Sequence, residues 1–270
     1  SIVLSPQVQA ALGLDRAEAT PAEVMGAILK ASVDLLWFGG IGPYVRASSE
    51  TDDQVGDRAN DAIRVTGAEL RAKVIGEGAN LGCTQRGRIE AALNGVRLNT
   101  DAIDNSAGVN TSDLEVNIKI ALAPPERAGR LDPAARDALL VDMTDEVAAP
   151  VLRNNYLQTL ALSLAERRGN AELGFASRLM QDLERAGRLD RSVEQLPDEA
   201  TLAERVRIGK ALTRPELAVL LAYAKLSLHD ELLESPVPDD PYLGKELDRY
   251  FPTELRERFP EAIGNHRLRR

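Results

Sequence analysis

Apolar runs and amphipathic segments alternate along the first 123 residues of the chain. The apolar runs at residues 33–38 and 73–75 each end in a glycine-rich stretch, which is typical of buried strands that open into loops. Ahead of the first run, Thr20 and Glu23 form the pattern of a capping box with Pro21 at the first helical position, and this pattern predicts a helix. The sequence here therefore favours strands and helices in alternation.

The segment from residue 72 to residue 120 continues this alternation. Thr84 is placed to cap a helix that ends before residue 94, and residues 96–98 indicate a further strand. Strand, loop, helix and strand in this order are typical of a parallel sheet. Ligands of such sheets bind at the carboxyl ends of the strands, so we expect Asn80 and Asn105, which both follow strands, to point into one crevice.

From about residue 124 almost every periodic signal is helical. Residues 124–130 contain two prolines and predict a hinge, and a long helix is expected from residue 134 to residue 168, broken or bent at Pro150. Thr213 and Glu216 form a second capping-box pattern that opens an apolar helix. The predicted fold class is α/β plus all-α, with a parallel sheet and flanking helices at residues 1–123 and a helical domain at residues 124–270.

Composition places the chain among globular proteins. Its 270 residues are 44% hydrophobic, which suffices for one large or two ordinary domains. The formal net charge of −9 argues against binding to nucleic acid or to an anionic membrane surface. Every apolar run falls short of the ~18 residues that span a bilayer. Cys83 is the single cysteine, so no internal disulfide is expected and the cytoplasm is the simplest setting.

Few side chains offer chemistry by themselves. His229 and His266 fall in the helical part, where a surface or capping role is expected of each, and the single cysteine supports no metal-ligand cluster. Cys83 is interpreted as a packing residue, with a reactive thiol as the alternative. The glycine-rich loops do not complete a G-x-G-x-x-G fingerprint, so their spacing alone indicates only tight turns. Single asparagines after strands are also turn formers more often than ligands.

Residues 56–65 predict a helix whose Ala59 and Ile63 face the sheet. A polar, acidic connection at residues 48–55 leads into it. The polar residues of the predicted helix are then interpreted as an exposed face with weak local pairs, and they are Asp57, Arg58, Asn60 and Asp61.

Three short stretches resemble the glutamate dehydrogenase superfamily. EGAN at residues 77–80 followed by Thr84, and NSAGVNTS at residues 105–112, are similar in spacing to the EGAN and NAGGVxxS stretches of that superfamily. DLLWFGG at residues 34–40 resembles the strand and loop that come before them. Longer stretches resemble the large bacterial NAD-specific glutamate dehydrogenases, and these are residues 34–45, 56–61, 73–120 and 212–220. The resemblance covers nearly the whole chain.

The resemblance implies a fold and a reaction. Residues 1–123 would be the second half of a Rossmann-like dinucleotide-binding domain. The reaction would be reversible oxidative deamination of L-glutamate to 2-oxoglutarate and ammonia, with hydride transfer to NAD. By the same resemblance, Asn80 and Asn105 would hold the nicotinamide ribose or carboxamide, for which an amide side chain offers both donor and acceptor. Gly39 and Gly40 would let the cofactor approach.

The resemblance also implies substrate contacts and a larger parent protein. Val109 and Ser112 would line the substrate pocket, with Ser112 hydrogen-bonded to the distal carboxylate of glutamate. Phe38 and Pro43 stand where the family pattern has Asn and Thr, so local polar contacts would differ. The catalytic lysine and aspartate of the family lie before the stretch that this chain resembles. The chain is therefore expected to be a fragment, inactive alone, of an enzyme that forms homo-oligomers as the full-length protein.

Two alternatives of other classes stay open. The α/β part is also consistent with a nucleotide-binding module without catalysis, which would bind cofactor but not turn over. The helical part is consistent with a structural module that packs against other domains or subunits, because an exposed apolar helical face favours association.

Overall fold

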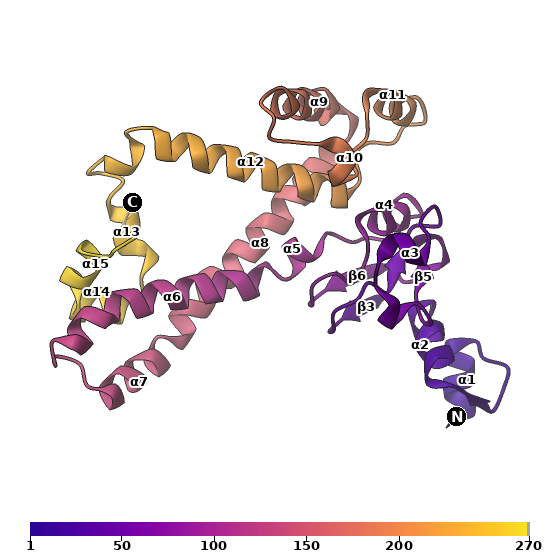
Figure 1. The fold of residues 1–270 in the computed structure, drawn as a ribbon, viewed down its shortest axis with the longest axis horizontal. Coiled ribbons are helices and arrows are strands. Elements are labelled where there is room, and N and C mark those ends of the chain that lie inside the picture. Colours follow the sequence, from indigo (N-terminus) through magenta and orange to yellow (C-terminus); the bar gives the residue numbers. More distant parts are fainter. Residues whose placement is uncertain (269–270) are drawn as a thin grey trace. The chain divides into compact units, whose positions relative to one another are not determined.

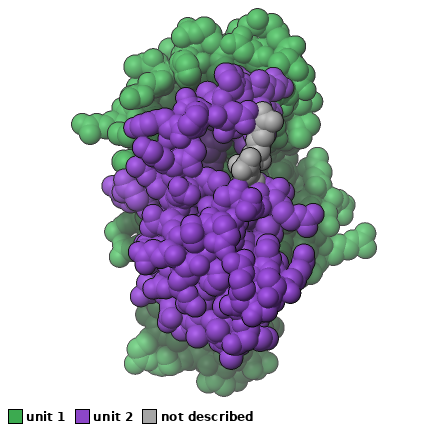
Figure 2. Space-filling view, turned by 90° about the vertical axis from the view of Figure 1, so that its left-hand side faces the viewer, with its two compact units in different colours: residues 1–105, 159–223 green, residues 106–158, 224–270 purple. Residues whose placement is uncertain are grey.

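The computed structural model describes residues 1–268 of the chain (Figure 1). The chain divides into two compact units, residues 1–105 with 159–223 and residues 106–158 with 224–270, which Figure 2 colours separately. The chain passes from one unit to the other within two long helices, after residue 158 in α8 (Thr144–Arg168) and after residue 223 in α12 (Arg214–Glu234). The division into a dinucleotide-binding domain at residues 1–123 and a helical domain at residues 124–270 stays a prediction.

The α/β part of the first unit contains three small sheets. Strands β3 (Leu35–Phe38) and β6 (Val74–Glu77) pair in parallel, as do β4 (Val45–Arg46) and β5 (Val65–Thr66), whereas β1 (Ile2–Val3) and β2 (Glu18–Ala19) are antiparallel. The helices of this part are α1 (Pro6–Leu12), α2 (Pro21–Leu29), α3 (Asp52–Val55), α4 (Gln85–Leu93), α5 (Asp101–Asp104), and the 3₁₀ helices η1 (Arg58–Asn60) and η2 (Gly67–Glu69). A mixed α/β part with short parallel pairs is therefore confirmed.

The two capped helices of the α/β part begin where the sequence predicted. The Thr20 side chain accepts from the Glu23 N–H, and the Glu23 carboxylate accepts from the Thr20 N–H at 2.8 Å, so the capping box that opens α2 is complete. The Thr84 hydroxyl accepts from the Gly87 N–H at 3.0 Å and starts α4.

Two predicted elements of this part are wrong. Residues 96–98 form no strand but a single parallel bridge between Arg97 and Val74, because the chain turns at once toward Thr100, whose carbonyl accepts from the first turn of α5. Residues 56–65 form η1 and a turn instead of a helix. Arg64, whose side chain is fully buried, draws the carboxylates of Asp52, Asp57 and Asp61 around itself, and this arrangement replaces the predicted helix.

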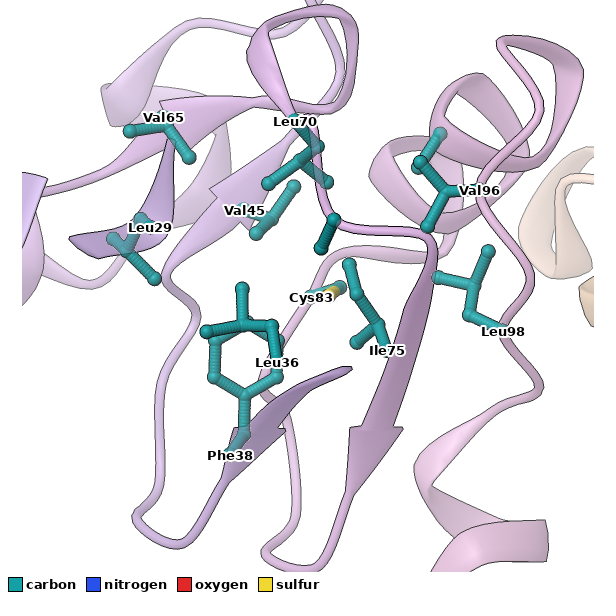
Figure 3. Packing of buried hydrophobic residues seen from close by; sticks show 12 residues of the cluster. Leu29, Leu36, Phe38, Val45, Val65, Leu70, Ile75, Cys83, Val96 and Leu98 are labelled. Carbon is teal, nitrogen blue, oxygen red and sulfur yellow. The ribbon is translucent and has the colours of Figure 1, made fainter. Parts of the chain in front are cut away.

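The core of the α/β part lies on one face of the β3–β6 pair (Figure 3). Alternation along β3 buries Leu36 and Phe38 and leaves Leu35 and Trp37 exposed. Cys83 is 2% exposed within this core, beside Leu36 and Ile75 in Figure 3, and burial raises the pKa of its thiol well above the usual value. The packing interpretation of Cys83 is confirmed, and the geometry gives no support to a reactive thiol.

The first unit also contains the end of α8, α9 (Asn170–Arg185), α10 (Arg191–Glu194), α11 (Glu199–Arg207) and the start of α12. Its helical core is formed by apolar residues of α9, α11 and α12 and of the segments between them. The predicted capping box at α12 is present, since the Glu216 carboxylate accepts from both the N–H and the hydroxyl of Thr213 at 2.7 Å. Glu216 is completely buried and also accepts from Arg205 at 2.7 Å. The entry into α12 is therefore fixed by buried charges as well as by apolar packing.

The second unit is helical. It contains α6 (Ser106–Arg127), α7 (Pro133–Asp142), η3 (Val237–Asp239), α13 (Lys245–Tyr250), α14 (Thr253–Arg258), α15 (Pro260–Gly264) and the remaining parts of α8 and α12. Its core joins Leu114, Ile118 and Leu122 of α6 to Leu255 and Ile263 of the last two helices.

The break predicted at residues 124–130 is present as the end of α6, but it falls after the two prolines and not at them. Helix α6 continues through Pro124 and Pro125, because a proline removes only its own N–H donor while their carbonyls still accept from the N–H groups of Ala128 and Arg130. The helix ends at Arg127, before Gly129 in the left-handed conformation.

The long helix expected over residues 134–168 is interrupted at Met143, which is buried between α7 and α8, and not at Pro150, which lies inside α8.

The two histidines differ from each other. His229 is exposed, as expected. His266 is buried, and its Nδ1 accepts from the Leu268 N–H, so its Nε2–H donates to the carbonyl of Asn117 at 3.0 Å. It therefore ties the end of the described chain to α6. Among residues 1–268, no helix has both the length and the apolar character needed to cross a bilayer.

Candidate functional site

The candidate site begins where β3 and β6 end side by side. The strands pair from Leu35 with Val74 to Phe38 with Glu77, and the Ala79 N–H donates to the Phe38 carbonyl at 3.0 Å. Because the strands are parallel, the loop that begins at Gly39 and the loop that carries Asn80 leave the same edge of the sheet. The two loops are therefore neighbours in the structure.

The two loops also pack closely against each other. A Cβ atom on Gly42 would lie 2.6 Å from the Leu81 carbonyl oxygen, so only glycine fits there. The Tyr44 N–H donates to the Gly82 carbonyl at 2.8 Å. Leu81 has a φ of 60°, and its N–H donates to the Asp101 carboxylate at 2.8 Å, which fixes this left-handed residue next to Asn80.

Asn80 and Asn105 are brought together. The Asn105 side-chain amide donates to Asn80 Oδ1 at 2.8 Å, across 25 residues of sequence. Asn80 follows β6, and Asn105 follows the four-residue helix α5. An asparagine offers two donor hydrogens and one acceptor oxygen, so the shared hydrogen bond leaves donors and an acceptor of the pair available to a ligand.

A buried ion pair lies at the end of β6, just before the loop that carries Asn80. Glu77, 1% exposed, receives two hydrogen bonds from Arg88, at 2.6 Å from Nε and 2.8 Å from Nη2. Burial raises the pKa of Glu77, and the Arg88 guanidinium offsets part of that effect. Burial by itself would lower the pKa of Arg88, but the Glu77 carboxylate outweighs it and the pKa is raised, so the arginine stays charged. Glu77 also accepts from the Cys83 N–H at 3.3 Å.

Asp104 forms a second support. Its carboxylate accepts from the Glu77 N–H at 3.0 Å and from the Asn99 side chain at 2.7 Å. Burial raises the pKa of Asp104, while these two hydrogen bonds act against the increase. Since Asp104 immediately precedes Asn105 and holds the end of β6, it links the segments that carry the two asparagines.

The glycines of the two loops serve different purposes. Cβ atoms on Gly76 and Gly78 would lie 2.5 Å and 2.3 Å from the indole of Trp37, so these glycines accommodate the tryptophan ring. A Cβ on Gly39 would meet nothing within 4 Å, and one on Gly40 would lie 3.2 Å from the hydroxyl of Tyr44. Gly39 and Gly40 are exposed and leave the approach to the strand ends open.

The other candidate residues lie elsewhere or face the core. Val109 and Ser112 belong to the first turns of α6, in the second unit, where Val109 is 73% exposed and Ser112 is exposed. Their role at the substrate stays a prediction. Phe38 faces the core and stacks on Tyr44, with ring centroids 5.5 Å apart, so it is a packing residue. No group of three or more His, Cys, Asp or Glu side chains within the described part of the chain is arranged to hold a metal ion.

Sequence reasoning missed the buried and half-buried polar residues behind the asparagines. Arg88 lies on α4, eleven residues after its partner Glu77, and the other missing members are Asn99, Asp101, Asp104 and Arg214. A buried ion pair between a strand and a helix has no periodic signature, because its partners are chosen by packing. The resemblance at residues 212–220 was the one signal that pointed to Arg214.

Comparisons with known proteins agree with the resemblance. The family model described as bacterial NAD-glutamate dehydrogenase, catalytic domain, matches residues 1–165, and the one described as glutamate dehydrogenase, C-terminal, matches residues 209–270. NAD-specific glutamate dehydrogenases of Pseudomonas aeruginosa and Halomonas elongata are 52% and 49% identical to the chain over 270 residues. That of Mycobacterium tuberculosis is 47% identical over 276 aligned positions. In each case the whole chain is covered, but it spans 17% of the length of the relative.

Proposed function

This chain belongs to the bacterial NAD-glutamate dehydrogenase family, and from that membership we propose that its α/β part supplies cofactor contacts to an NAD-dependent glutamate dehydrogenase. The reaction is the interconversion of L-glutamate with 2-oxoglutarate and ammonia. The observation that carries the proposal is the hydrogen-bonded Asn80–Asn105 pair at the carboxyl end of β6. In this proposal the chain binds and positions the cofactor, and none of its residues is assigned a proton transfer.

The residues present fit a nicotinamide dinucleotide. When bound, NAD would supply the acceptor for the hydride that leaves the substrate carbon carrying the amino group. The Asn80–Asn105 pair retains donors and an acceptor that match a carboxamide or a ribose hydroxyl. The space over Gly39 lets a flat ring come close to the strand ends. In this proposal β3 and β6 are two strands of a Rossmann-like sheet, and Val109 and Ser112 contact the substrate.

The proposal is tested by titrating the chain with NADH and following Trp37 emission, because the indole lies over Gly76 and Gly78 at the end of β6. We expect saturable quenching that Asn80→Ala weakens. Asn154→Ala is the matched control, since Asn154 is exposed in the middle of α8. Gly39→Ala is expected to weaken binding without changing the melting temperature, because its new methyl group would fill only the open approach.

Saturable binding that is equally strong in the wild type and in Asn80→Ala would overturn the assignment of Asn80. Absence of NADH binding to the wild-type chain would reject the view that these residues assemble the cofactor crevice by themselves. The same titration on one of the longer relatives would then show whether the crevice forms only together with other parts of the longer protein. The proposal also includes that the longer protein is cytoplasmic and forms homo-oligomers.

An assembly role is a second candidate, and the uncovered face of the β3–β6 pair favours it. Leu35 and Trp37 on this face are 56% and 57% exposed, and Val33 and Val74 are exposed beside them. Parallel sheets are normally covered on both faces, so this apolar face is suited to a protein surface. Sedimentation velocity should detect association that Leu35→Lys removes. A wild-type chain that stays monomeric over the whole concentration range would count against this role.

A further inference from the structure

Arg214 is a buried arginine at the start of α12 that donates both to the end of α8 and to the α/β part of its own unit. Its side chain is 6% exposed. Its Nη1 donates to the Ser163 hydroxyl at 3.1 Å and to the Glu166 carboxylate at 2.8 Å, and its Nε donates to Asn99 Oδ1 at 3.0 Å. A buried guanidinium is stable only when its donors find acceptors, so these three contacts define its position.

The contact with Asn99 continues into the candidate site. Asn99 accepts from Arg214 through its oxygen and donates to Asp104 Oδ1 through its amide nitrogen, at 2.7 Å. Asp104 Oδ2 in turn accepts from the Glu77 N–H at 3.0 Å. The orientation of the Asn99 amide is fixed, because arginine can only donate and a carboxylate can only accept. Reversing the amide would break both hydrogen bonds at once.

Arg214, Asn99 and Asp104 thus form a hydrogen-bond relay. The relay ends on the two segments that carry the asparagines. Glu77 is the last residue of β6, three residues before Asn80, and Asp104 immediately precedes Asn105. The relay also joins the two regions matched by separate family models, since Arg214 lies in the C-terminal match and Asn99 and Asp104 lie in the catalytic match.

We propose that Arg214 is a positioning residue that acts through Asn99 and Asp104 to hold Asn80 and Asn105 in their hydrogen-bonded arrangement. The inference rests on the proposed function only for its consequence, which is that the cofactor binds more tightly when the two asparagines are held in place. The relay itself is a property of the folded chain and is testable without cofactor.

Loss of Arg214 should loosen the site without unfolding it. In Arg214→Gln the Asn99 oxygen loses the guanidinium that fixes it, so the hydrogen bond from Asn99 to Asp104 is held less firmly. The Glu77–Arg88 pair does not depend on the relay and keeps β6 attached to α4. The expected change is therefore local, in the loop at residues 77–83 and in α5.

Arg205→Gln is the matched control. Arg205 Nη1 donates to the buried Glu216 carboxylate at 2.7 Å, so its loss also breaks a buried ion pair at the start of α12. Within residues 1–268, no hydrogen bond or ion pair joins Arg205 to Asn99. A purely structural role for Arg214 predicts that the two variants behave alike.

The experiment is amide hydrogen exchange of the cofactor-free chain, followed at residues 77–83, together with melting temperatures. Arg214→Gln should accelerate exchange there about tenfold, as expected for the loss of one charge-assisted hydrogen bond in the relay. Arg205→Gln should leave exchange at residues 77–83 unchanged although its melting temperature falls. Equal acceleration in both variants, or none in Arg214→Gln, would overturn the proposal.

Asn99→Ala provides a second route to the same answer if Arg214→Gln does not fold. It interrupts the relay while the Arg214–Glu166 pair stays intact, and it should accelerate exchange at residues 77–83 to the same degree. The double variant should exchange no faster than either single variant, because both break one relay, whereas additive effects would contradict it.

NADH titration of the same variants separates the relay from the proposed function. If the wild-type chain binds NADH, Arg214→Gln and Asn99→Ala should each weaken binding about tenfold, and Arg205→Gln should not. If the wild-type chain does not bind NADH, the proposed function of this chain fails, and the exchange data still decide whether the relay exists.

Discussion

Substitution of Arg88 by methionine should show how strongly the buried charges hold the candidate site. Arg88 is 6% exposed, and Glu77 beneath the Asn80 loop is 1% exposed. Methionine fills a similar space but leaves the Glu77 carboxylate buried with the Cys83 N–H and without its cation. The substitution also removes the 3.2 Å contact between Arg88 and Asp101.

The expected loss is about 3–5 kcal/mol of the free energy of unfolding near neutral pH, because an uncompensated buried charge remains. Removing both charges, in Glu77→Gln with Arg88→Met, should cost less than Arg88→Met alone, since no buried charge is then left unpaired. A domain of ordinary stability is worth about 5–15 kcal/mol, so the single variant should still be measurable by urea unfolding.

The pH dependence of the loss identifies its cause. Burial already raises the pKa of Glu77 in the folded chain, and removal of Arg88 raises that pKa further. A carboxyl whose pKa is higher in the folded than in the unfolded chain binds its proton more readily in the folded state. Stability therefore falls as the pH rises from the unfolded to the folded pKa.

Arg88→Met should thus lose more stability near pH 7 than near pH 5, by up to about 1.4 kcal/mol for each pH unit within that range. Urea unfolding of the wild type, the single variant and the double variant at both pH values measures this difference. An equal loss at both pH values, or a double variant less stable than Arg88→Met, would refute the reasoning.

Three further outcomes are expected. Gly78→Ala should displace the Trp37 indole, shift its emission and cost about 1–3 kcal/mol, whereas Gly39→Ala, the control with open space, should change neither; an unshifted spectrum in Gly78→Ala would contradict this. Arg64→Lys should destabilise the chain by about 2–3 kcal/mol in urea unfolding, because one ammonium cannot replace the guanidinium fork, and a stability equal to the wild type would argue against it. Cys83 should react with a thiol reagent only after urea unfolding, and rapid labelling of the folded chain would disprove its burial.

Local sequence signals located most of the regular elements. The capping residues Thr20, Thr84 and Thr213 each start a helix in the structure, because a cap depends on residues within one turn of it. The apolar runs before Gly39 and Gly78 form strands as predicted, because an apolar run closed by glycines is also a local signal.

The failures lie where a distant partner decides the local structure. The helix expected at residues 56–65 is replaced by a turn around Arg64, whose carboxylate partners lie up to twelve residues away. The strand expected at residues 96–98 reduces to one bridge, because the chain leaves the sheet toward α5. Within the hinge predicted at residues 124–130, α6 continues through both prolines and ends only at Arg127, because its Leu114, Ile118 and Leu122 are packed in a core.

The sequence by itself determined the family, the positions of the two glycine-rich loops and the position of Asn80 after a strand. Only the tertiary structure decided that Asn80 and Asn105 are hydrogen-bonded to each other, and that Asp104 and Arg88 both bind Glu77 at the end of β6. The physical reason is the distance along the sequence over which each interaction acts. Capping and periodicity act within a few residues of the chain, whereas a buried polar group takes its partner from whichever element packs against it, since an unpaired group in the interior is costly.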